Sequence, residues 1–265
     1  MTEELKFAIY LAKKAGDVLV NGFENCFLKN PQAYRRNEIT NMDLESEKMI
    51  IGLIKKKYPS HRIISEECGI VEGKSDYVWI IDPLDGTKYY SAGIKACNVL
   101  ISLWKGNTPL VGVVYLPFTK DIYWAEKGGG AFFNRKKIFV SKVNKFKESV
   151  IFVDAARSDK LNKKELHLAA KKLGIILENC YRLRGISFGP LPLCYIAQGI
   201  AEAFFDLTGK QKIWDLAPGF VIVKEAGGKI TGLDGRFHGQ DVSNAVVTNG
   251  KIHNEFLKLL NSAKN

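Results

Sequence analysis

The chain has 265 residues, of which 46% are hydrophobic and 25% charged, a balance that is typical of globular proteins and excludes disordered and fibrous classes. Its formal net charge of +11 is spread over single basic residues and short clusters, which predicts attraction for anions such as phosphorylated metabolites or nucleic acid. No apolar run approaches the roughly 20 residues of a membrane helix and no secretory pattern opens the chain, so we expect a cytoplasmic protein without membrane contact. The five cysteines include no Cys-x-x-Cys pair, which argues against zinc sites and disulfide frameworks.

The first half of the chain predicts two helices followed by a sheet. Apolar residues at helical spacing predict an amphipathic helix over 3–23, and early acids with late lysines predict a second helix over 43–58. Between these helices, the polar stretch 28–42 has no clear period and predicts a loop. Runs rich in β-branched and aromatic residues then predict strands at 62–65, 77–82, 98–104, 110–115 and 122–125.

In the second half of the chain, short predicted strands alternate with predicted helices. Three consecutive glycines at 128–130 lead into a segment that predicts a hairpin, with its turn near Asn134 and Arg135. From there on, predicted strands near 150–154, 178–183, 201–206 and 244–248 alternate with predicted helices near 161–173, 187–199, 215–226 and from 251. This alternation predicts an α/β second lobe. We therefore expect two lobes, residues 1–145 and residues 146–265, within one compact unit.

Acidic residues stand at four places where the pattern predicts a strand end or a helix start. They are Asp43, the pair Glu66 and Glu67, Asp82 with Asp85, and Asp215. Loops at the carboxyl ends of strands are where α/β proteins usually build their sites. Each acid also has a simpler structural explanation, since Asp43 and Asp215 could be helix N-caps and Glu66 a solvated turn residue.

The segment 82–87, Asp-Pro-Leu-Asp-Gly-Thr, is harder to explain structurally, because a cap needs one carboxylate and this segment has two. Unit charges about 4 Å apart repel by roughly 4 kcal/mol at an effective dielectric constant of about 20. A cluster of such acids is therefore destabilising unless a cation neutralises it. Oxygen ligands with no histidine or cysteine in the pattern favour magnesium or manganese over zinc.

The other residues of this segment suit an anion beside the metal. Pro83 should hold the two aspartates at a fixed separation, Gly86 leaves room for a ligand, and Thr87 brings a hydroxyl to an expected helix start. Metal ions beside an anion indicate phosphoryl chemistry. A haloacid-dehalogenase nucleophile is excluded because two residues rather than one separate the acids, and an EF-hand is excluded because acids do not alternate.

The order of the motifs strongly resembles the inositol monophosphatase family, within the lithium-sensitive, magnesium-dependent phosphatase superfamily. The resemblance covers nearly the whole chain, and although each motif alone is weak, their joint order is specific. In chain order the motifs are Ile39-Thr40-x-x-Asp43, Ser65-Glu66-Glu67, Asp82-Pro-Leu-Asp-Gly-Thr87 and Trp214-Asp215, with supporting pieces at 112–115, 128–134 and 225–228.

The resemblance implies a fold and a set of metal ligands. The fold would be α/β (α+β), a layered αβαβα sugar-phosphatase fold of two lobes, commonly found as a homodimer. The cofactor would be two to three Mg²⁺ ions, with Mn²⁺ as a substitute. The first ion would be held by Glu66, Asp82 and the carbonyl of Leu84, the second by Asp82, Asp85 and Asp215, and a weaker third would lie near Glu66.

The resemblance also implies roles in catalysis and substrate binding. Asp43 and Thr87 would orient and deprotonate the attacking water beside Glu66, without a covalent phosphoenzyme. Substrate contacts are implied at Asp85, Gly86, Thr87, Gly185, Ser187 and Asp206.

Departures from the family pattern fall where the substrate is chosen. Ile186 replaces a hydroxyl residue, and Ala155-Ala156-Arg157 stands where Ser-Ser-Arg is frequent. Lys88 replaces a frequent threonine, and a lysine at this position resembles the pattern of the branch that removes phosphate from 3′-phosphoadenosine nucleotides. The metal chemistry is therefore intact in sequence, whereas a preference for inositol does not follow.

We accordingly expect a magnesium-dependent phosphatase that acts on small phosphate monoesters, with inositol 1-phosphate as the first candidate and fructose 1,6-bisphosphate as a further substrate. The alternative enzyme is a phosphatase for 3′-phosphoadenosine 5′-phosphate or NADP, which Lys88 and the basic charge favour. The alternative of another class is an RNA-binding or transcription-associated protein on the same fold, although no aromatic platform is interleaved with the basic residues.

Overall fold

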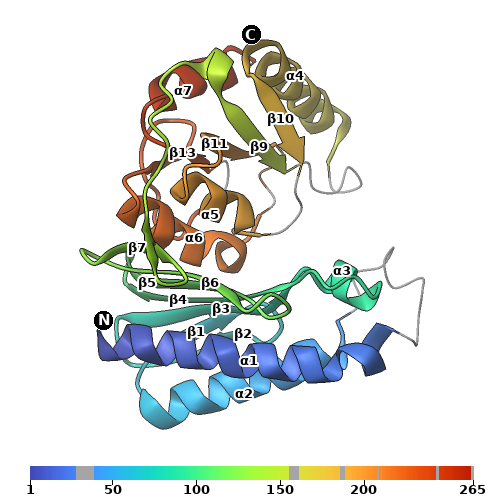
Figure 1. Cartoon of the computed structure of the whole chain (residues 1–265), viewed down its shortest axis with the longest axis vertical. Helices are drawn as coiled ribbons and strands as arrows, with labels where there is room; N and C mark the ends of the chain where they lie inside the picture. The colour runs from blue at the N-terminus through green and yellow to red at the C-terminus, as the bar shows by residue number, and fades with distance from the viewer. Residues whose placement is uncertain are drawn as a thin grey trace.

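Helices and sheets alternate in five layers along the long axis of the molecule (Figure 1). The computed structural model describes residues 1–27, 39–154, 161–185, 189–207, 209, 211–242 and 245–263. A helix pair, an eight-stranded sheet, a second helix pair, a five-stranded sheet and an outer helix pair follow one another. The predicted α/β class and the layered αβαβα arrangement are therefore confirmed.

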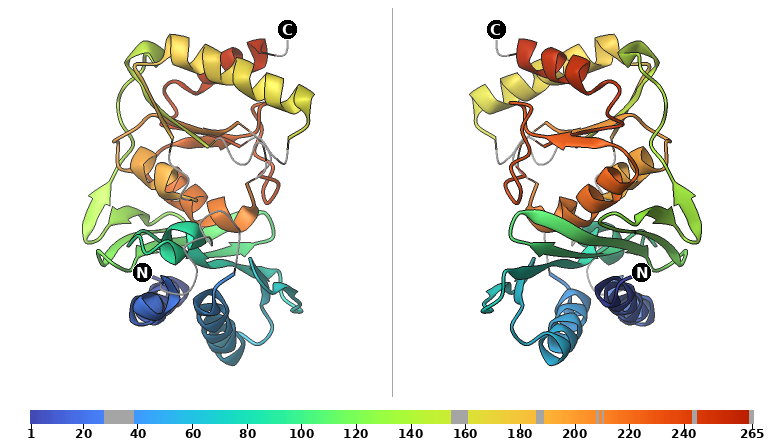
Figure 2. Two further views of the ribbon diagram at one scale, coloured as in Figure 1. Left: turned by 90° about the vertical axis from the view of Figure 1, so that its right-hand side faces the viewer. Right: turned by 90° about the vertical axis from the view of Figure 1, so that its left-hand side faces the viewer.

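The first layer consists of α1 (Glu3–Phe27) and α2 (Asn41–Lys57), which lie side by side below the first sheet (Figure 2). The apolar stripe of α1, including Leu5, Leu11 and Leu19, is fully buried against that sheet. Helix α2 begins two residues earlier than predicted because Thr40 caps it, so residues 41 and 42 of the predicted loop are helical. Residues 28–38 of that predicted loop lie outside the described residues.

The first sheet has the strand order β2-β1-β3-β4-β5-β6-β7-β8. Strands β1 and β3 are parallel, whereas the other neighbouring pairs are antiparallel. Its strands are β1 (Arg62–Ser65), β2 (Gly69–Val71), β3 (Tyr77–Asp85), β4 (Asn98–Lys105), β5 (Thr108–Leu116), β6 (Asp121–Glu126), β7 (Gly130–Phe133) and β8 (Lys136–Ile138). The short strand β2 was not predicted from the sequence.

Strand β3 is buried on both faces, which explains its nearly continuous apolar run. Trp79 and Ile81 pack toward α1 and α2, while Val78 and Ile80 face the opposite core. The predicted strand 77–82 was too short, since β3 continues to Asp85 through an irregularity in its pairing with β4. Pro83 lies within this irregularity, where it has no N–H group to offer the ladder.

The middle layer holds α5 (Leu191–Ala197) and α6 (Ile213–Glu225) between the two sheets. Helix α6 is apolar on all sides because it packs against β3, β4 and β5 below and the second sheet above. It approaches β5 very closely at Gly112, where an added Cβ would lie 2.4 Å from the carbonyl oxygen of Pro218. The predicted helix at 187–199 was too long, as α5 covers only seven residues.

The second sheet has the order β10-β9-β11-β13-β12 and is covered by α4 (Lys163–Asn179) and α7 (His253–Ser262). Its strands are β9 (Val150–Asp154), β10 (Arg182–Gly185), β11 (Ala203–Asp206), β12 (Lys229–Thr231) and β13 (Val246–Thr248). Strand β12 was not predicted, and the predicted strand 178–183 was misplaced because α4 runs to Asn179. Strands β9, β10 and β11 are parallel, so their carboxyl ends meet at one edge.

Two short elements complete the described chain, a five-residue helix α3 (Thr87–Ser91) and a 3-10 turn at Phe146–Glu148. The lobe boundary at residues 145 and 146 stays a prediction; it falls between the end of β8 and the start of β9. In the part of the chain that the structure describes, no helix combines the length and apolar character that a membrane crossing requires.

Candidate active site

The pairing of β1 with β3 brings Glu66 and Asp82 together. These strands run parallel with Ser65 opposite Ile81, so the next residue of each strand emerges at the same edge. The two carboxyl groups are within hydrogen-bonding reach of each other. Asp82 is buried, with 1% of its surface exposed, whereas Glu66 retains contact with solvent.

The irregular end of β3 is held by several hydrogen bonds. Asp82 Oδ1 accepts a bond from the backbone N–H of Leu84 at 2.9 Å, across the irregularity in the pairing of β3 with β4. Asp85 Oδ2 accepts a bond from the Asn98 side chain at 2.8 Å, and Asp85 Oδ1 accepts one from the N–H of Gly189 at 3.2 Å. Both aspartates are therefore held by backbone N–H groups and by Asn98 of β4, whereas the role of Pro83 in fixing their separation stays a prediction.

Gly189 brings the second half of the chain to this turn. An added Cβ at this position would lie 3.0 Å from Asp85 Oδ2 and 3.1 Å from the backbone oxygen of Asp215. Any side chain here would press on both segments at once. The close approach explains why a glycine stands at this point, although nothing in the sequence singled it out.

Asp43 and Thr87 meet beside the turn. Thr87 Oγ1 lies 3.1 Å from Asp43 Oδ1 and 3.0 Å from the carbonyl oxygen of Leu84. Gly86 precedes Thr87 with a φ of 91°, a left-handed conformation that favours glycine, and it makes the turn from β3 into α3. Asp43 is the third residue of α2 and bonds back to Thr40 in a capping box, so it is not the N-cap residue itself.

Asp215 reaches the site from α6, in the second half of the chain. Asp215 is the third residue of this helix, and Lys212 is the N-cap residue. The Oδ2 atom of Asp215 accepts a hydrogen bond from the N–H of Lys212 at 2.7 Å. Burial, together with the charges of Asp85 and Asp154, raises the pKa of Asp215 to about 7. The carboxyl group of Asp215 therefore interacts electrostatically with Asp85 of β3 and Asp154 of β9.

The acids of the site repel one another strongly. Burial, followed by the charges of Asp215 and Glu67, raises the pKa of Glu66 to about 8. Burial and the charge of Glu66 raise the pKa of Asp82 well above its ordinary value, and burial raises the pKa of Asp85 to about 6. Across the described ranges, no lysine or arginine forms an ion pair with these carboxylates.

This donor set fits magnesium. It contains carboxylate and carbonyl oxygens, which Mg²⁺ prefers, and it carries negative charge that a cation would neutralise. No three acidic, histidine or cysteine side chains among the described residues are arranged as a closed metal site as they stand. The assignment of individual ligands therefore stays a prediction.

Two of the expected substrate contacts, Gly185 and Asp206, lie at the carboxyl ends of strands in the second sheet. Asp206 ends β11 opposite Asp154 at the end of β9, and Gly185 ends the neighbouring strand β10. Gln211 joins the two acids: its N–H donates to Asp206 Oδ2 at 3.0 Å and its side-chain amide donates to Asp154 Oδ2. Ser187, Ile186 and the segment 155–157 lie outside the described residues.

Asp154 was missed by the sequence interpretation. It is buried, and burial followed by the charge of Asp206 raises its pKa to about 6, while Lys88 acts in the opposite direction. The signal in the sequence is an acid at the end of a predicted strand, the position where α/β proteins build their sites. No comparable signal marked Asn98, which opens β4.

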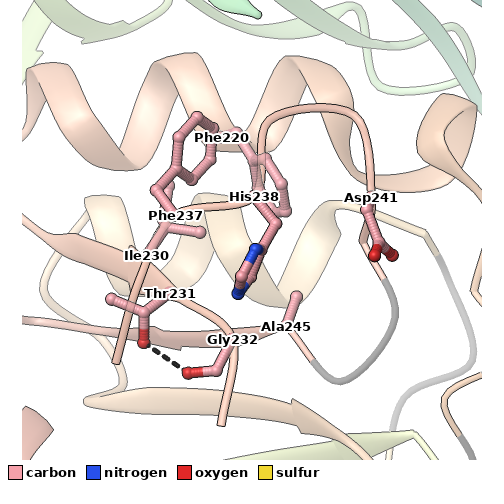
Figure 3. A pocket seen from close by; sticks show the side chains of 8 residues that line it. All are labelled: Phe220, Ile230, Thr231, Gly232, Phe237, His238, Asp241 and Ala245. Carbon is pink, nitrogen blue, oxygen red and sulfur yellow. Dashed lines mark hydrogen bonds between the residues drawn. The ribbon is translucent and has the colours of Figure 1, made fainter. Parts of the chain in front are cut away.

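One small cavity lies away from these acids (Figure 3). Its volume is about 10 Å³, and it lies where Phe220 of α6 meets β12 and the following loop. Thr231, in its lining, donates a hydrogen bond to the carbonyl oxygen of Gly232. None of the acids described above lines this cavity, so it is not part of the candidate active site.

Comparisons with known proteins agree with the motif order. The model described as the inositol monophosphatase family matches residues 1–265. The fructose-1,6-bisphosphatase/inositol-1-monophosphatase of Aquifex aeolicus is 33% identical over 263 residues, which cover 97% of this chain and 96% of that protein. The Nus factor SuhB of Haemophilus influenzae is 34% identical over 237 residues, which cover 88% of this chain and 86% of that protein. The IMPase structure of Thermotoga maritima superposes with a TM-score of 0.84 at 29% identity, covering 99% of this chain and 98% of that one.

Proposed function

We propose that this chain, which belongs to the inositol monophosphatase family and is a phosphatase, hydrolyses small phosphate monoesters by direct attack of a metal-activated water, with inositol 1-phosphate as its first substrate. Fructose 1,6-bisphosphate is a further substrate under this proposal. Phosphatases of this family use Mg²⁺. For this chain we propose two to three Mg²⁺ ions, replaceable by Mn²⁺, and sensitivity to lithium.

The observation that carries the proposal is the meeting of four acids from three distant segments, of which Asp82 is buried, Asp85 and Asp215 are half-buried and Glu66 is exposed. Glu66 leaves β1, Asp82 and Asp85 end β3, and Asp215 enters from α6. Each has a raised pKa, and within the described segments no basic side chain pairs with any of them. A protein that keeps such repulsion in its interior needs a cation there.

The ligands would be the carboxylates of Glu66, Asp82, Asp85 and Asp215 together with the carbonyl oxygen of Leu84. When bound, magnesium ions supply activation of a water nucleophile and neutralisation of the phosphate and leaving-group oxygens. The hydrogen bonds from Asn98 and Gly189 would hold Asp85 in one orientation throughout.

Asp43 and Thr87 would handle the proton of the attacking water. The Thr87 hydroxyl lies within hydrogen-bonding distance of Asp43 Oδ1, so it can pass its proton to that carboxylate as it takes one from water. Burial raises the pKa of Asp43, which makes it a stronger base than an exposed aspartate. The proton leaves water, reaches Thr87 Oγ1, and the proton of Thr87 ends on Asp43. Gly86 would leave room for the phosphate beside this pair.

The residues at the end of the second sheet support a polyol substrate. Asp154 and Asp206 offer carboxylate oxygens, which accept hydrogen bonds from the hydroxyl groups of a sugar or cyclitol. Gly185 ends the neighbouring strand β10 and would contact the same substrate, and Ser187, outside the described residues, stays a proposed contact. The charge of Lys88 lowers the pKa of Asp154 against the larger effects of burial and Asp206, so the carboxylates dominate this end of the site. This arrangement favours a hydroxylated substrate over one that carries a second phosphate.

Phosphate release tests the proposal. Purified protein would be incubated with Mg²⁺ and, separately, inositol 1-phosphate, fructose 1,6-bisphosphate, 3′-phosphoadenosine 5′-phosphate and NADP, with a chelator as the control. We expect the highest kcat/KM with inositol 1-phosphate and no release under the chelator. A preference for either nucleotide would support the alternative that Lys88 favours, and the absence of release from all four would refute the proposed hydrolysis of these esters.

A second candidate function is binding to RNA or to the transcription machinery. It is favoured by the similarity to proteins named Nus factor SuhB and by the net charge of +11. A mobility-shift titration with RNA at several salt concentrations would test it, since phosphate contacts make affinity fall steeply with salt.

We also propose that the chain forms a homodimer and that it is located in the cytoplasm. Sedimentation of the purified protein would test the first proposal, and fractionation of cells would test the second.

A further inference from the structure

Helix α2 presents a buried polar face to the candidate active site. Asp43, Ser46 and Glu47 have 1%, 0% and 4% of their surfaces exposed, and Ser46 and Glu47 share the face of Asp43 because they follow it by three and four residues. Asp43 accepts a bond from Thr87, and the Ser46 hydroxyl donates to the carbonyl oxygen of Pro83 at 3.3 Å. One rigid helix thus contacts both the start of α3 and the turn that ends β3.

Glu47 contacts a third segment, the turn that joins β1 to β2. Its Oε1 atom accepts hydrogen bonds from the hydroxyl of Ser65 and from the backbone N–H groups of Glu67 and Cys68, the latter two at 3.1 Å each. In the described residues no basic side chain forms an ion pair with Glu47. Three donors therefore converge on a single oxygen of a buried carboxylate, which is the strong, charge-assisted type of hydrogen bonding.

The turn that Glu47 holds is the one that presents Glu66. Ser65 pairs with Gly69 across the hairpin, so the loop has three residues and closes on a glycine with a φ of 73°. Glu66 is the first of the three, and the residues on both sides of it are bonded to Glu47. The direction of its side chain toward Asp82 consequently depends on contacts that Glu66 does not make itself.

We propose that Glu47 is a positioning residue, which holds the Glu66 turn in the geometry that binds the metal ion. The inference rests on the proposed function, because it assumes that Glu66 is a ligand of Mg²⁺. Residues that orient metal ligands from behind typically change metal affinity by about 10- to 100-fold when they are removed. The role differs from simple stabilisation of the hairpin, which would affect unfolding without changing the affinity of the folded protein for Mg²⁺.

Calorimetric titration of the full chain with Mg²⁺ tests the role of Glu47. We expect Glu47→Ala to raise the Kd for Mg²⁺ by about 10- to 100-fold. We expect Glu47→Gln to stay within about threefold of wild type, since all three bonds go to one oxygen and the amide oxygen can accept them. Glu45→Ala, which removes an exposed acid from the same helix, is the matched control and should leave the Kd unchanged. Excess Mg²⁺ should restore turnover in Glu47→Ala.

A wild-type Kd in folded Glu47→Ala would overturn the inference. Should that variant fail to fold, Ser65→Ala removes one of the three bonds, and an unchanged Kd for it would likewise overturn the inference. The melting temperature of the metal-free variants shows whether they are folded. If the wild-type protein itself binds no Mg²⁺, the proposed metal site is wrong. This outcome differs from the one that overturns the role of Glu47, in which the wild type binds Mg²⁺ and the variants bind it equally well.

Discussion

The hydroxyl of Thr87 lies 3.1 Å from Oδ1 of Asp43, so the first turn of α2 and the start of α3 are joined across a gap of 44 residues in sequence. Each residue is also held from behind, Asp43 by Thr40 and Thr87 by the carbonyl oxygen of Leu84. The pair is therefore oriented before any substrate arrives, which is a property expected of a general base and its partner.

Neutralising Asp43 should abolish most turnover. Asp43→Asn keeps an oxygen for the capping box but loses the basic carboxylate, so we expect kcat to fall by about 10²- to 10⁴-fold with little change in KM. Thr87→Val should have a similar effect, whereas Thr87→Ser retains a hydroxyl and serves as the control. Steady-state phosphate release measures all three variants. Wild-type kcat in both Asp43→Asn and Thr87→Val would contradict the proposed proton path.

Neutralising Asp215 should raise the stability of the metal-free protein and lower its turnover. Asp215→Asn keeps the acceptor for the N–H of Lys212 and removes one of several mutually repelling charges. We expect the metal-free variant to melt at a higher temperature than wild type, by roughly 2–4 °C for each kcal/mol of repulsion relieved. Turnover should fall by more than about 100-fold, because a proposed metal ligand is lost.

Asp85→Asn should also lose most of its turnover, although it forfeits one hydrogen bond and should gain less stability. Glu178→Gln, an exposed acid on α4, is the control and should change neither property. Calorimetry with and without Mg²⁺ measures the melting temperatures. Variants at Asp85 and Asp215 that retain wild-type turnover would rule out the metal assignment.

A methyl group at Gly189 should displace the carboxylate of Asp85. The added Cβ would lie 3.0 Å from Asp85 Oδ2, closer than ordinary contact, so the carboxylate must move by a few tenths of an ångström. We expect Gly189→Ala to lower kcat/KM by about 10- to 100-fold, since catalytic geometry tolerates little displacement. Gly174→Ala in α4, where nothing lies within 4 Å, should keep full activity and gain up to about 1 kcal/mol of stability. Equal activity in both variants would contradict this account.

Removing the charge of Asp154 should shift substrate preference. Asp154→Asn removes a negative charge from the side of the site that Lys88 influences, so the site becomes more favourable to a second phosphate. We expect the ratio of kcat/KM for fructose 1,6-bisphosphate to that for inositol 1-phosphate to rise by about tenfold, or roughly 1.4 kcal/mol. Lys88→Met should move the ratio in the opposite direction. A ratio that neither substitution changes would remove both residues from substrate selection.

His253 makes stability depend on pH. The ring is fully buried, with Nε2 2.9 Å from Thr231 Oγ1 and Nδ1 2.9 Å from Thr248 Oγ1. Because the Thr231 hydroxyl donates to Gly232, it accepts from Nε2–H, and Nδ1 is left as the acceptor for Thr248. Every polar atom of the neutral ring is thus satisfied, and a second proton on Nδ1 would break the hydrogen bond that Thr248 donates. Burial lowers the pKa of His253 from 6.5 to about 4.

The unfolded chain therefore binds more protons than the folded chain between about pH 4 and pH 6.5. Stability from this group is complete above pH 6.5 and is lost as the pH falls toward 4, by up to about 3 kcal/mol. Urea unfolding at pH 7.5 and pH 5 should show a smaller loss in His253→Asn than in wild type. His167→Asn, an exposed histidine on α4, should keep the wild-type loss, and equal losses in all three proteins would contradict the prediction.

Much of the fold could be predicted because its elements carry strong local signals. The apolar stripe at 3–23 and the apolar run at 77–82 predict an amphipathic helix and a strand, and both occur as α1 and β3. The errors fall where local signals are weak. Strands β2 and β12 have only three residues each, and the extension of β3 past Pro83 depends on pairing with β4 rather than on propensity.

By itself, the sequence determined the residue types of the site and the order of its motifs, because oxygen ligands, a glycine turn and a hydroxyl are local chemical requirements. The family membership that the motifs predicted is confirmed over residues 1–265. Only the tertiary structure decided which groups meet. The parallel register of β1 and β3 puts Glu66 beside Asp82, and the buried face of α2 carries Glu47 to the turn behind Glu66. Such contacts depend on strand register and helix packing across distant segments, which no local pattern encodes.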